Sequence, residues 1–466
     1  MTGRTRHKEI RREIRLNAFH MNAPGHSWAG LWTHPKDRCA DYTDLDFWIE
    51  LARTAERGKL DGIFLADVSG VYDVYAGTPD AALAAGAQIP SNDPSVLISA
   101  MAAATRDLGF GVTASVGYEQ PYYLARRFST LDHLTKGRVG WNIVTGYLES
   151  AARAIGDGGV REHDQRYDRA DEFLELAYRL WEGSWEDDAA VRDKAGRVFV
   201  RPEKVHRITH RGTFFDLDAI HLSEPSPQRT PLLYQAGTSG RGREFAARHA
   251  ECVFMNQSRA AVAEAAADIR RRAAAYGRHP EDLLVFVGAT VIVAPTEAEA
   301  RDKYEEYRSH LDTRGALALL SGWTGIDFSQ FGPDDPVRYV KSNGMQSKIE
   351  AMTLRSPDRV WRVRDLADFG EVGGRGPFIV GTPSQVADEL LTWVEAGADG
   401  FNLTRVVEPA NLTDIVDLLV PELQDRGVYK TEYSPGPLRE KLFGPGRARL
   451  SPRHPGHAFC HPGPAT

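Results

Sequence analysis

The sequence predicts an α/β fold, namely a single (β/α)8 TIM barrel with insertions at the C-terminal face of the strands. Three observations support it: eight short apolar runs, helical patterns between them, and a length of 466 residues, which one such barrel can fill. The apolar runs lie at 14–19, 62–66, 110–115, 138–144, 232–236, 252–256, 284–293 and 400–403. Strands that alternate with helices pair in parallel through right-handed crossovers.

Helical patterns fill the intervals between these runs. They span 44–57, 94–106, 122–134, 169–181, 241–249, 260–276, 297–310, 384–396 and 412–423. Gly58, Gly277 and Gly397 each follow one of these patterns, in the position where glycine commonly ends a helix. The positions of these glycines therefore agree with the strand and helix assignment.

Three stretches are too long for simple connections and are interpreted as insertions, at about 68–93, 183–230 and 313–379. In this fold we expect them to build the mouth of the active site. The Gly-rich segment Gly370–Gly376 is a candidate lid hinge, and plain disorder is the alternative. The predicted organisation is an N-terminal extension at 1–13, a barrel domain at 14–433 and a C-terminal arm at 434–466.

Composition narrows the class of partner and compartment. A net charge of −7 disfavours nucleic acid and anionic membranes, and no apolar run approaches the length of a membrane span. Cys39, Cys252 and Cys460 lie far apart without metal or redox spacing, which favours a reducing, cytoplasmic setting. We therefore expect a cytoplasmic protein whose partners are neither nucleic acid nor a membrane.

A metal site is not expected. His206 and His210 have a suitable spacing and His221 could add a third ligand, but no carboxylate constellation accompanies them. Neither a phosphate-binding P-loop nor a nucleophile elbow is present. An organic cofactor is then the natural carrier of difficult chemistry.

Polar residues close three of the predicted strands. Asp67 follows the second strand, Thr113 and Ser115 close the third, and Asn142 lies at the end of the fourth. Each alone could be a turn or capping residue. Because the carboxyl ends of barrel strands converge, their joint placement indicates one binding site.

The fifth strand, PLLYQAG, leads through Thr238, Ser239 and Gly240 into a helix, so backbone N–H groups at that helix start could bind a phosphate. A plain N-cap is the alternative interpretation. His163 and Tyr167 stand four residues apart in HDQRY, just before a helix expected near residue 169, and can face one ligand. No G-x-G-x-x-G dinucleotide fingerprint follows a strand.

Segments along most of the chain resemble a known family. They are NAFHMN, HSWAGLWTHP, FLADVSGVYDVY, QIPSNDP, GRVGWNIVTGYLES, HDQRYDRADEFLELAYRLWEG and PLLYQAGTSGRGREFAARHA. Together they resemble the two-component FMN-dependent monooxygenases of the bacterial luciferase-like type, which include nitrilotriacetate and dibenzothiophene-sulfone monooxygenases. Within this family, the sequence most resembles the branches that act on long-chain alkanes and dimethylsulfide. The similarity runs from about Arg15 to Leu450.

The resemblance implies roles for ten residues. Asp67, Thr113, Ser115 and Asn142 would line the flavin ring and ribityl chain; His163, Tyr167 and Ser239 would hold its phosphate; His26, Tyr72 and Gln88 would orient substrate and stabilise a flavin hydroperoxide. It further implies diffusible reduced FMN from a separate NAD(P)H-dependent flavin reductase, O2 as co-substrate, and a homodimer or homotetramer. The organic substrate would be small or elongated and mostly apolar, an alkyl sulfide, sulfone or alkane.

Four positions depart from the alkane branch. Ala23 replaces a pocket cysteine, Tyr147 replaces a histidine, and Ala316 and Leu319 stand where histidines are expected. These changes put alkane hydroxylation in doubt and leave the flavin site intact. Two further readings stay open: a deazaflavin-dependent dehydrogenase on the same barrel, and a flavin-binding protein without catalytic activity.

Overall fold

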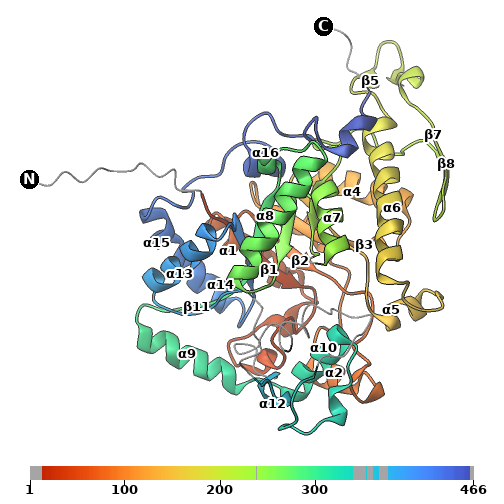
Figure 1. The fold of residues 1–466 in the computed structure, drawn as a ribbon. Coiled ribbons are helices and arrows are strands. Elements are labelled where there is room, and N and C mark those ends of the chain that lie inside the picture. The colour runs from red at the N-terminus through yellow and green to blue at the C-terminus, as the bar shows by residue number, and fades with distance from the viewer. Residues whose placement is uncertain (1–12, 238, 339–352, 354–359, 367–375, 462–466) are drawn as a thin grey trace, which may run out of the picture.

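Eight parallel strands close into a barrel in the computed structural model, which describes residues 13–237, 239–338, 353, 360–366 and 376–461 (Figure 1). The strands are β1 Arg15–Met21, β2 Gly62–Ala66, β3 Gly109–Ser115, β4 Val139–Val144, β9 Leu232–Gln235, β10 Cys252–Met255, β11 Leu284–Val293 and β13 Gly400–Thr404. Their order is β10-β9-β4-β3-β2-β1-β13-β11, and pairing of β10 with β11 closes the ring. The predicted barrel and all eight of its strands are confirmed.

Helices surround the ring as the patterns predicted. They are α1 Leu45–Arg57, α3 Ile98–Ala103, α4 Pro121–Thr135, α6 His163–Gly183, α7 Gly240–His249, α8 Arg259–Ala275, α9 Glu297–Ser309 and α13 Pro383–Glu395. The last predicted helix is a run of α14 Ala410–Asp414, a π-helical turn Ile415–Leu419 and α15 Val420–Asp425. One boundary was wrong: α6 begins at His163, not near residue 169, so HDQRY forms its first turns.

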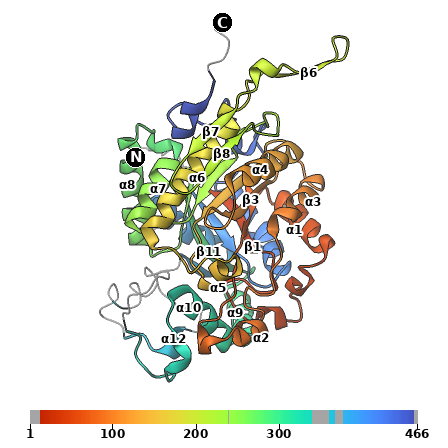
Figure 2. The same ribbon diagram turned by 90° about the vertical axis from the view of Figure 1, so that its right-hand side faces the viewer.

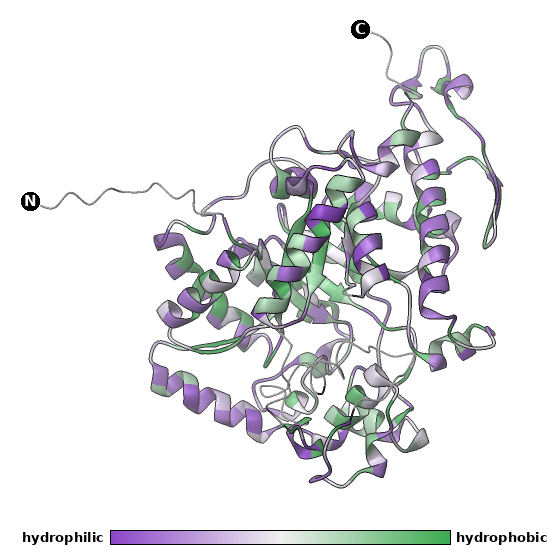
Figure 3. Cartoon of the chain, viewed as in Figure 1, coloured by the Kyte–Doolittle hydropathy of each residue, from purple (hydrophilic) through white to green (hydrophobic). Residues whose placement is uncertain are grey.

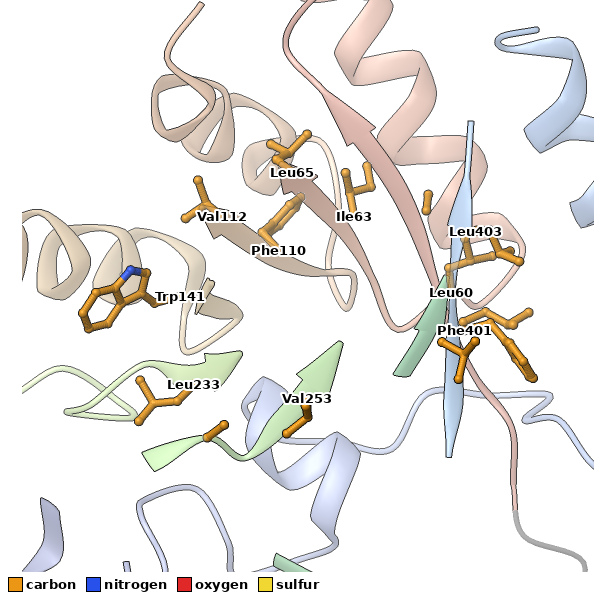
Figure 4. Close-up of a cluster of buried hydrophobic side chains, with 14 of the residues drawn as sticks. Leu60, Ile63, Leu65, Phe110, Val112, Trp141, Leu233, Val253, Phe401 and Leu403 are labelled. Carbon is orange, nitrogen blue, oxygen red and sulfur yellow. The ribbon is translucent and has the colours of Figure 1, made fainter. Parts of the chain in front are cut away.

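Apolar side chains fill the layer between strands and helices. Figure 4 shows members of this layer from β2, β3, β4, β9, β10 and β13. Trp141 of β4 is fully buried between Phe128 of α4 and Phe173 of α6, with ring centroids 5.6 and 5.9 Å away. The colouring in Figure 3 agrees, since hydrophobic residues concentrate in the central strands while α9 is largely hydrophilic.

A second cluster fills the inside of the ring. Phe64 packs edge to face against Tyr234 with ring centroids 5.2 Å apart, and Phe286 lies 6.2 Å from Tyr234. Leu438 and Leu442 belong to the same cluster and come from α16 Leu438–Phe443 in the C-terminal arm. The arm thus plugs one end of the barrel, and the cavity described below opens at the other.

A buried ion pair anchors this plug. Arg439 of α16 is 1% exposed, and its Nε lies 2.7 Å from Oε1 of Glu251. The guanidinium also donates to the carbonyl oxygens of Thr230, Pro231 and Ala448 at 2.8–3.0 Å. Every charge and donor in this contact is therefore matched.

Two of the three predicted insertions cover the carboxyl end of the barrel. The segment 68–93 contains α2 Asp80–Ala85, and 313–379 contains α10 Thr313–Thr324 and α12 Val363–Leu366. Residues of all three helices share one apolar cluster, and they lie together at one end of the molecule (Figures 1 and 2). The candidate hinge at Gly370–Gly376 lies outside the described residues except for Gly376.

The third insertion does not build the mouth of the site, which corrects that expectation. Segment 183–230 forms two hairpins, β5 Ala190–Asp193 with β6 Val198–Val200 and β7 Ile208–Arg211 with β8 Asp216–Ala219. Figure 2 shows these hairpins at the end opposite α2, α10 and α12. The reason is topological: the segment connects the end of a helix to the next strand, and such connections lie at the amino ends of barrel strands.

Candidate functional site

A cavity of about 1130 Å³ lies at the carboxyl ends of the strands. Its walls come from the ends of β1 to β4, β9 and β10, from the first turns of α6 and α7, and from both covering insertions. All ten residues singled out in the sequence line this one cavity: His26, Asp67, Tyr72, Gln88, Thr113, Ser115, Asn142, His163, Tyr167 and Ser239. Residues spread over more than 200 positions of sequence are thus brought together.

One end of the cavity is suited to an anion. Ser239 is the N-cap of α7, where its Oγ accepts from the backbone N–H of Gly242 at 3.0 Å. His163 of α6 lies with Nε2 3.2 Å from the same Oγ, and the Tyr167 ring packs 5.2 Å from the His163 ring. Helix amides, the hydroxyl and the imidazole therefore converge on a spot that the helix dipole makes favourable for negative charge.

Glycine permits this arrangement. A Cβ on Gly242 would lie 2.8 Å from the Tyr167 hydroxyl oxygen and 3.0 Å from Ser239 Oγ. A Cβ on Gly237 would meet the side-chain nitrogen of Gln235 at 2.2 Å. Any larger residue at either position would occupy the space between the α7 start and α6, which the backbone needs in order to approach a ligand.

The middle of the cavity presents buried amide oxygens. Asn142 is 5% exposed; its Nδ2 donates to Thr113 Oγ1 at 2.8 Å, and that hydroxyl donates to the Leu65 carbonyl oxygen at 2.8 Å. Within the part of the chain that the structure describes, Asn142 Oδ1 has no partner, and neither does Oε1 of Gln235 on the adjacent strand. An unpaired buried carbonyl costs about 1–3 kcal/mol, so these oxygens indicate a ligand with N–H donors.

Asp67 adds an unusual carboxyl to this region. Burial, followed by the nearby Asp93 carboxylate, raises the pKa of Asp67 to about 7. Near neutral pH the group is therefore divided between its acid and carboxylate forms and can either donate or accept a hydrogen bond. Ser115 Oγ, at the end of the next strand, accepts from the backbone N–H of Gly117 at 3.2 Å.

The other end of the cavity is aromatic. His26 is buried and packs edge to face on Phe19, with ring centroids 4.5 Å apart. Phe254 continues this wall 5.3 Å from Phe19. The covering insertions add Tyr72 and Trp323, both buried.

A hydrogen-bonded group spans this aromatic end. The Tyr72 hydroxyl donates to Gln88 Oε1 at 2.7 Å and lies 3.0 Å from the Tyr147 hydroxyl. The Trp323 indole N–H donates to the Tyr72 hydroxyl oxygen at 3.3 Å. Gln88 Nε2 donates to the carbonyl oxygen of His26 at 2.9 Å. Four segments far apart in sequence are thus linked at one point.

Several lining residues were missed in the sequence. Gln235 ends a predicted strand, so the rule that found Asn142 could have found it too. Arg166 and Arg243 lie in the first turns of α6 and α7, and Trp323 sits in a long insertion. For Trp323 no sequence signal exists, because only the packing of α10 against Tyr72 brings it to the cavity.

The three histidines considered for a metal do not meet. His206 Nε2 lies 3.1 Å from Glu186, His210 Nε2 lies 3.1 Å from Glu172, and His221 Nε2 lies 2.9 Å from Ser129 Oγ. Among the described residues, no group of three or more His, Cys, Asp or Glu side chains is arranged to hold a metal ion. None of the described helices is long and apolar enough to span a membrane.

Comparison with known proteins defines the class. The family described as luciferase-like monooxygenases matches residues 18–400. The chain is 48% identical to dimethyl-sulfide monooxygenase of Hyphomicrobium sulfonivorans over 96% of this chain and 93% of that protein. It is 48% identical to long-chain alkane monooxygenase of Geobacillus thermodenitrificans over 95% of this chain and 97% of that protein.

Solved structures agree. A crystal structure of long-chain alkane monooxygenase superposes with a TM-score of 0.89 at 46% identity, covering 96% of this chain and 99% of that one. A riboflavin lyase solved with modified FMN and riboflavin gives a TM-score of 0.90 at 37% identity, covering 97% and 100%. The chain belongs to the luciferase-like monooxygenase family. It is an oxidoreductase of the monooxygenase class, as the resemblance implied.

Proposed function

We propose that this chain is a two-component monooxygenase that binds reduced FMN from a separate NAD(P)H-dependent reductase and transfers one oxygen atom of O2 to an organic substrate. The substrate would be small or elongated and mostly apolar, in the class of alkyl sulfides, sulfones and alkanes. One observation supports the proposal: a single cavity joins a helix start with the Ser239 N-cap, the two unpaired buried amide oxygens of Asn142 and Gln235, and an aromatic end.

The residues present fit FMN along its length. Ser239, His163 and Tyr167 with the first amides of α7 would hold the phosphate. Asn142 and Gln235 would accept hydrogen bonds from N–H groups of the ring system, which would satisfy their unpaired oxygens. When bound, the reduced flavin would supply the electrons and the ring carbon at which O2 is activated as a hydroperoxide.

Other residues would line the ring and position the substrate. Asp67, Thr113 and Ser115 occupy strand ends beside Asn142, where the flavin ring and ribityl chain would pass. His26, Tyr72 and Gln88 enclose the aromatic end, which would exclude water from the reacting atoms.

The charge distribution favours an uncharged substrate. Three arginines line the cavity, and they come from α6, α7 and α8. Arg166 donates to the Gly146 carbonyl oxygen, Arg243 pairs with Asp268, and Arg272 pairs with Glu244. Two of these cations, Arg243 and Arg272, are thus paired with carboxylates, and Arg166 already donates to a backbone carbonyl, while Phe254, Leu148 and Trp323 add apolar surface to the cavity. A polycarboxylate would find a poor match here.

The decisive test is anaerobic titration with reduced FMN, followed by mixing with oxygenated buffer and recording absorbance. A long-lived intermediate, together with incorporation of ¹⁸O from labelled O2 into an added sulfide, sulfone or alkane, would support the proposal. Tight FMN binding without any labelled product would refute the oxygenase activity. Retention of a deazaflavin in preference to FMN would favour a dehydrogenase instead.

Self-association, a cytoplasmic location and the reductase partner are parts of the same proposal. We expect a homodimer or homotetramer in solution, which light scattering coupled to gel filtration would measure. A single peak at the monomer mass of 51.6 kDa would contradict that expectation.

A further inference from the structure

The direction of the hydrogen bonds at the aromatic end of the cavity can be deduced from its donors and acceptors. Gln88 Nε2 lies 2.9 Å from the carbonyl oxygen of His26. A carbonyl oxygen only accepts, so the amide NH2 of Gln88 must face it. The amide oxygen of Gln88 then faces the Tyr72 hydroxyl at 2.7 Å, and Tyr72 must be the donor in that bond.

This choice fixes the neighbouring bond. A phenol hydroxyl carries one hydrogen, and Tyr72 donates its hydroxyl hydrogen to Gln88. The contact of 3.0 Å between the Tyr72 and Tyr147 hydroxyls therefore requires Tyr147 to donate. Burial raises the pKa of Tyr72 to about 12 and the pKa of Tyr147 well above its usual value, so both phenols stay protonated near neutral pH.

The hydroxyl hydrogen of Tyr147 is therefore used in the bond to Tyr72, and the Tyr147 oxygen can only accept a hydrogen bond from a ligand. Tyr147 lines the cavity, as do Tyr72, Gln88 and Trp323. The Trp323 indole N–H is also directed at this pair of phenols. At the phenol pair the protein offers lone pairs, and a ligand oxygen placed against Tyr147 would meet an acceptor.

Close packing surrounds the side chains that form this chain of hydrogen bonds. Tyr72 is 1% exposed, and α10 approaches its ring so closely that a Cβ on Gly322 would lie 2.2 Å from Cδ1 of Tyr72. Gln88 is buried and has a backbone φ of 59°. Both side chains are thus enclosed by close packing, which favours the observed direction of these hydrogen bonds.

We infer that Gln88, by fixing the direction of this hydrogen-bond sequence, makes the phenol pair acceptor-only and so selects thioethers and hydrocarbon chains over sulfoxides and sulfones. The inference rests on the proposed function and narrows its substrate class. A thioether sulfur or a methylene chain needs no donor from the protein. Sulfoxide and sulfone oxygens are strong acceptors, and burying them against Tyr147 leaves them unpaired.

The test compares three ligands of matched carbon skeleton, namely dipropyl sulfide, dipropyl sulfoxide and dipropyl sulfone, binding to the FMN-loaded protein in calorimetric titrations. A wild-type preference for the sulfide is required, but it is not sufficient, since sulfones are also better hydrated in water. The informative change is Gln88→Met, which removes the acceptor for Tyr72. Tyr72 can then donate to Tyr147, and the Tyr147 hydrogen becomes available to a ligand.

In Gln88→Met we expect sulfone and sulfoxide binding to tighten about three- to tenfold, the value of one added hydrogen bond, with sulfide binding changed less than about twofold. The matched control is Gln88→Glu, whose protonated side chain can accept from Tyr72 and donate to the His26 carbonyl oxygen, so no gain is expected. Adding both Tyr72→Phe and Tyr147→Phe to Gln88→Met should abolish the gain, because neither phenol hydrogen is then left to donate to a ligand.

Three outcomes would overturn the inference: sulfone binding equal to or tighter than sulfide binding in the wild type, no gain in Gln88→Met, or a gain that persists when both Tyr72 and Tyr147 are replaced by Phe. Failure of all three ligands to bind the wild type would overturn it as well. Failure of the proposed function is recognised separately, by the absence of FMN binding or of ¹⁸O incorporation. A protein that binds FMN and shows the predicted ligand ranking without oxygenating anything would contradict the function and leave the selectivity standing.

Discussion

The sharpest test of the phosphate end is Ser239→Ala. The Ser239 hydroxyl caps α7 by accepting from Gly242 N–H at 3.0 Å and can donate to a bound phosphate. Losing a hydrogen bond to a charged group costs about 1.5–3 kcal/mol, which corresponds to a roughly 10- to 150-fold weaker affinity for FMN. Loss of the cap adds about 1 kcal/mol of destabilisation to the helix whatever ligand is bound.

Riboflavin provides the internal control, since it carries the same ring and ribityl chain without the phosphate. Quenching of flavin fluorescence would give both dissociation constants for the wild type and the variant. We expect Ser239→Ala to weaken FMN at least tenfold and riboflavin less than threefold. Equal losses for the two ligands would mean that Ser239 supports the loop and does not contact the phosphate, and an unchanged FMN affinity would refute the placement altogether.

Three further perturbations follow from buried groups. Asn142→Leu removes an unpaired acceptor, so the free energy of unfolding without ligand should change by less than about 1 kcal/mol while the stabilisation by added FMN, read from thermal melts, falls. Arg439→Met leaves the Glu251 carboxylate buried and unpaired and should cost about 3–5 kcal/mol in urea unfolding, with Glu251→Gln in the same chain recovering a substantial part. Burial raises the pKa of Glu408 from 4.5 to about 8, so the folded state holds a proton that the unfolded chain releases. The contribution of Glu408 to stability should therefore fall between pH 4.5 and pH 8, measured as a change over this range in the difference between the urea midpoints of the wild type and Glu408→Gln.

The Glu408 expectation depends on which charge state the buried pair adopts. His20 Nε2 lies 4.0 Å from Glu408 Oε1, a separation that would also suit an ion pair. Burial lowers the pKa of His20 and raises that of Glu408, so both directions favour neutral groups. A stability that rises from pH 6.5 to pH 8 would contradict this assignment.

Sequence periodicity captured the barrel because each of its strands is a short run buried on both faces. Asn142 and Thr113 could be expected at one site for the same reason, since they close neighbouring strands and in fact stand opposite each other in the register of β3 and β4. The position of 183–230 could be deduced only by counting whether it follows a strand or a helix, and length alone misled.

Side-chain partnerships across long intervals were beyond such reasoning. Tyr72 and Trp323 are 251 positions apart, and no local pattern announces that α10 will pack on the loop after β2. The start of α6 was missed because its first turn, HDQR, is polar throughout and Glu162 provides no side-chain cap. Local rules therefore located the strand-end residues and failed for the parts whose position depends on tertiary packing.

The plug formed by α16 has a consequence for the order in which the molecule can mature. The ring lacks a strand until β13, which pairs with both β1 and β11, has been synthesised as far as residue 404, and the amino end of the barrel stays open until Leu438, Arg439 and Leu442 follow. Until then the inner face around Phe64 and Phe286 is open to solvent at that end. The nascent chain on the ribosome would thus have an incomplete barrel interior for most of its translation. The amino end of that interior would be shielded from water only after the residues of α16 have been synthesised.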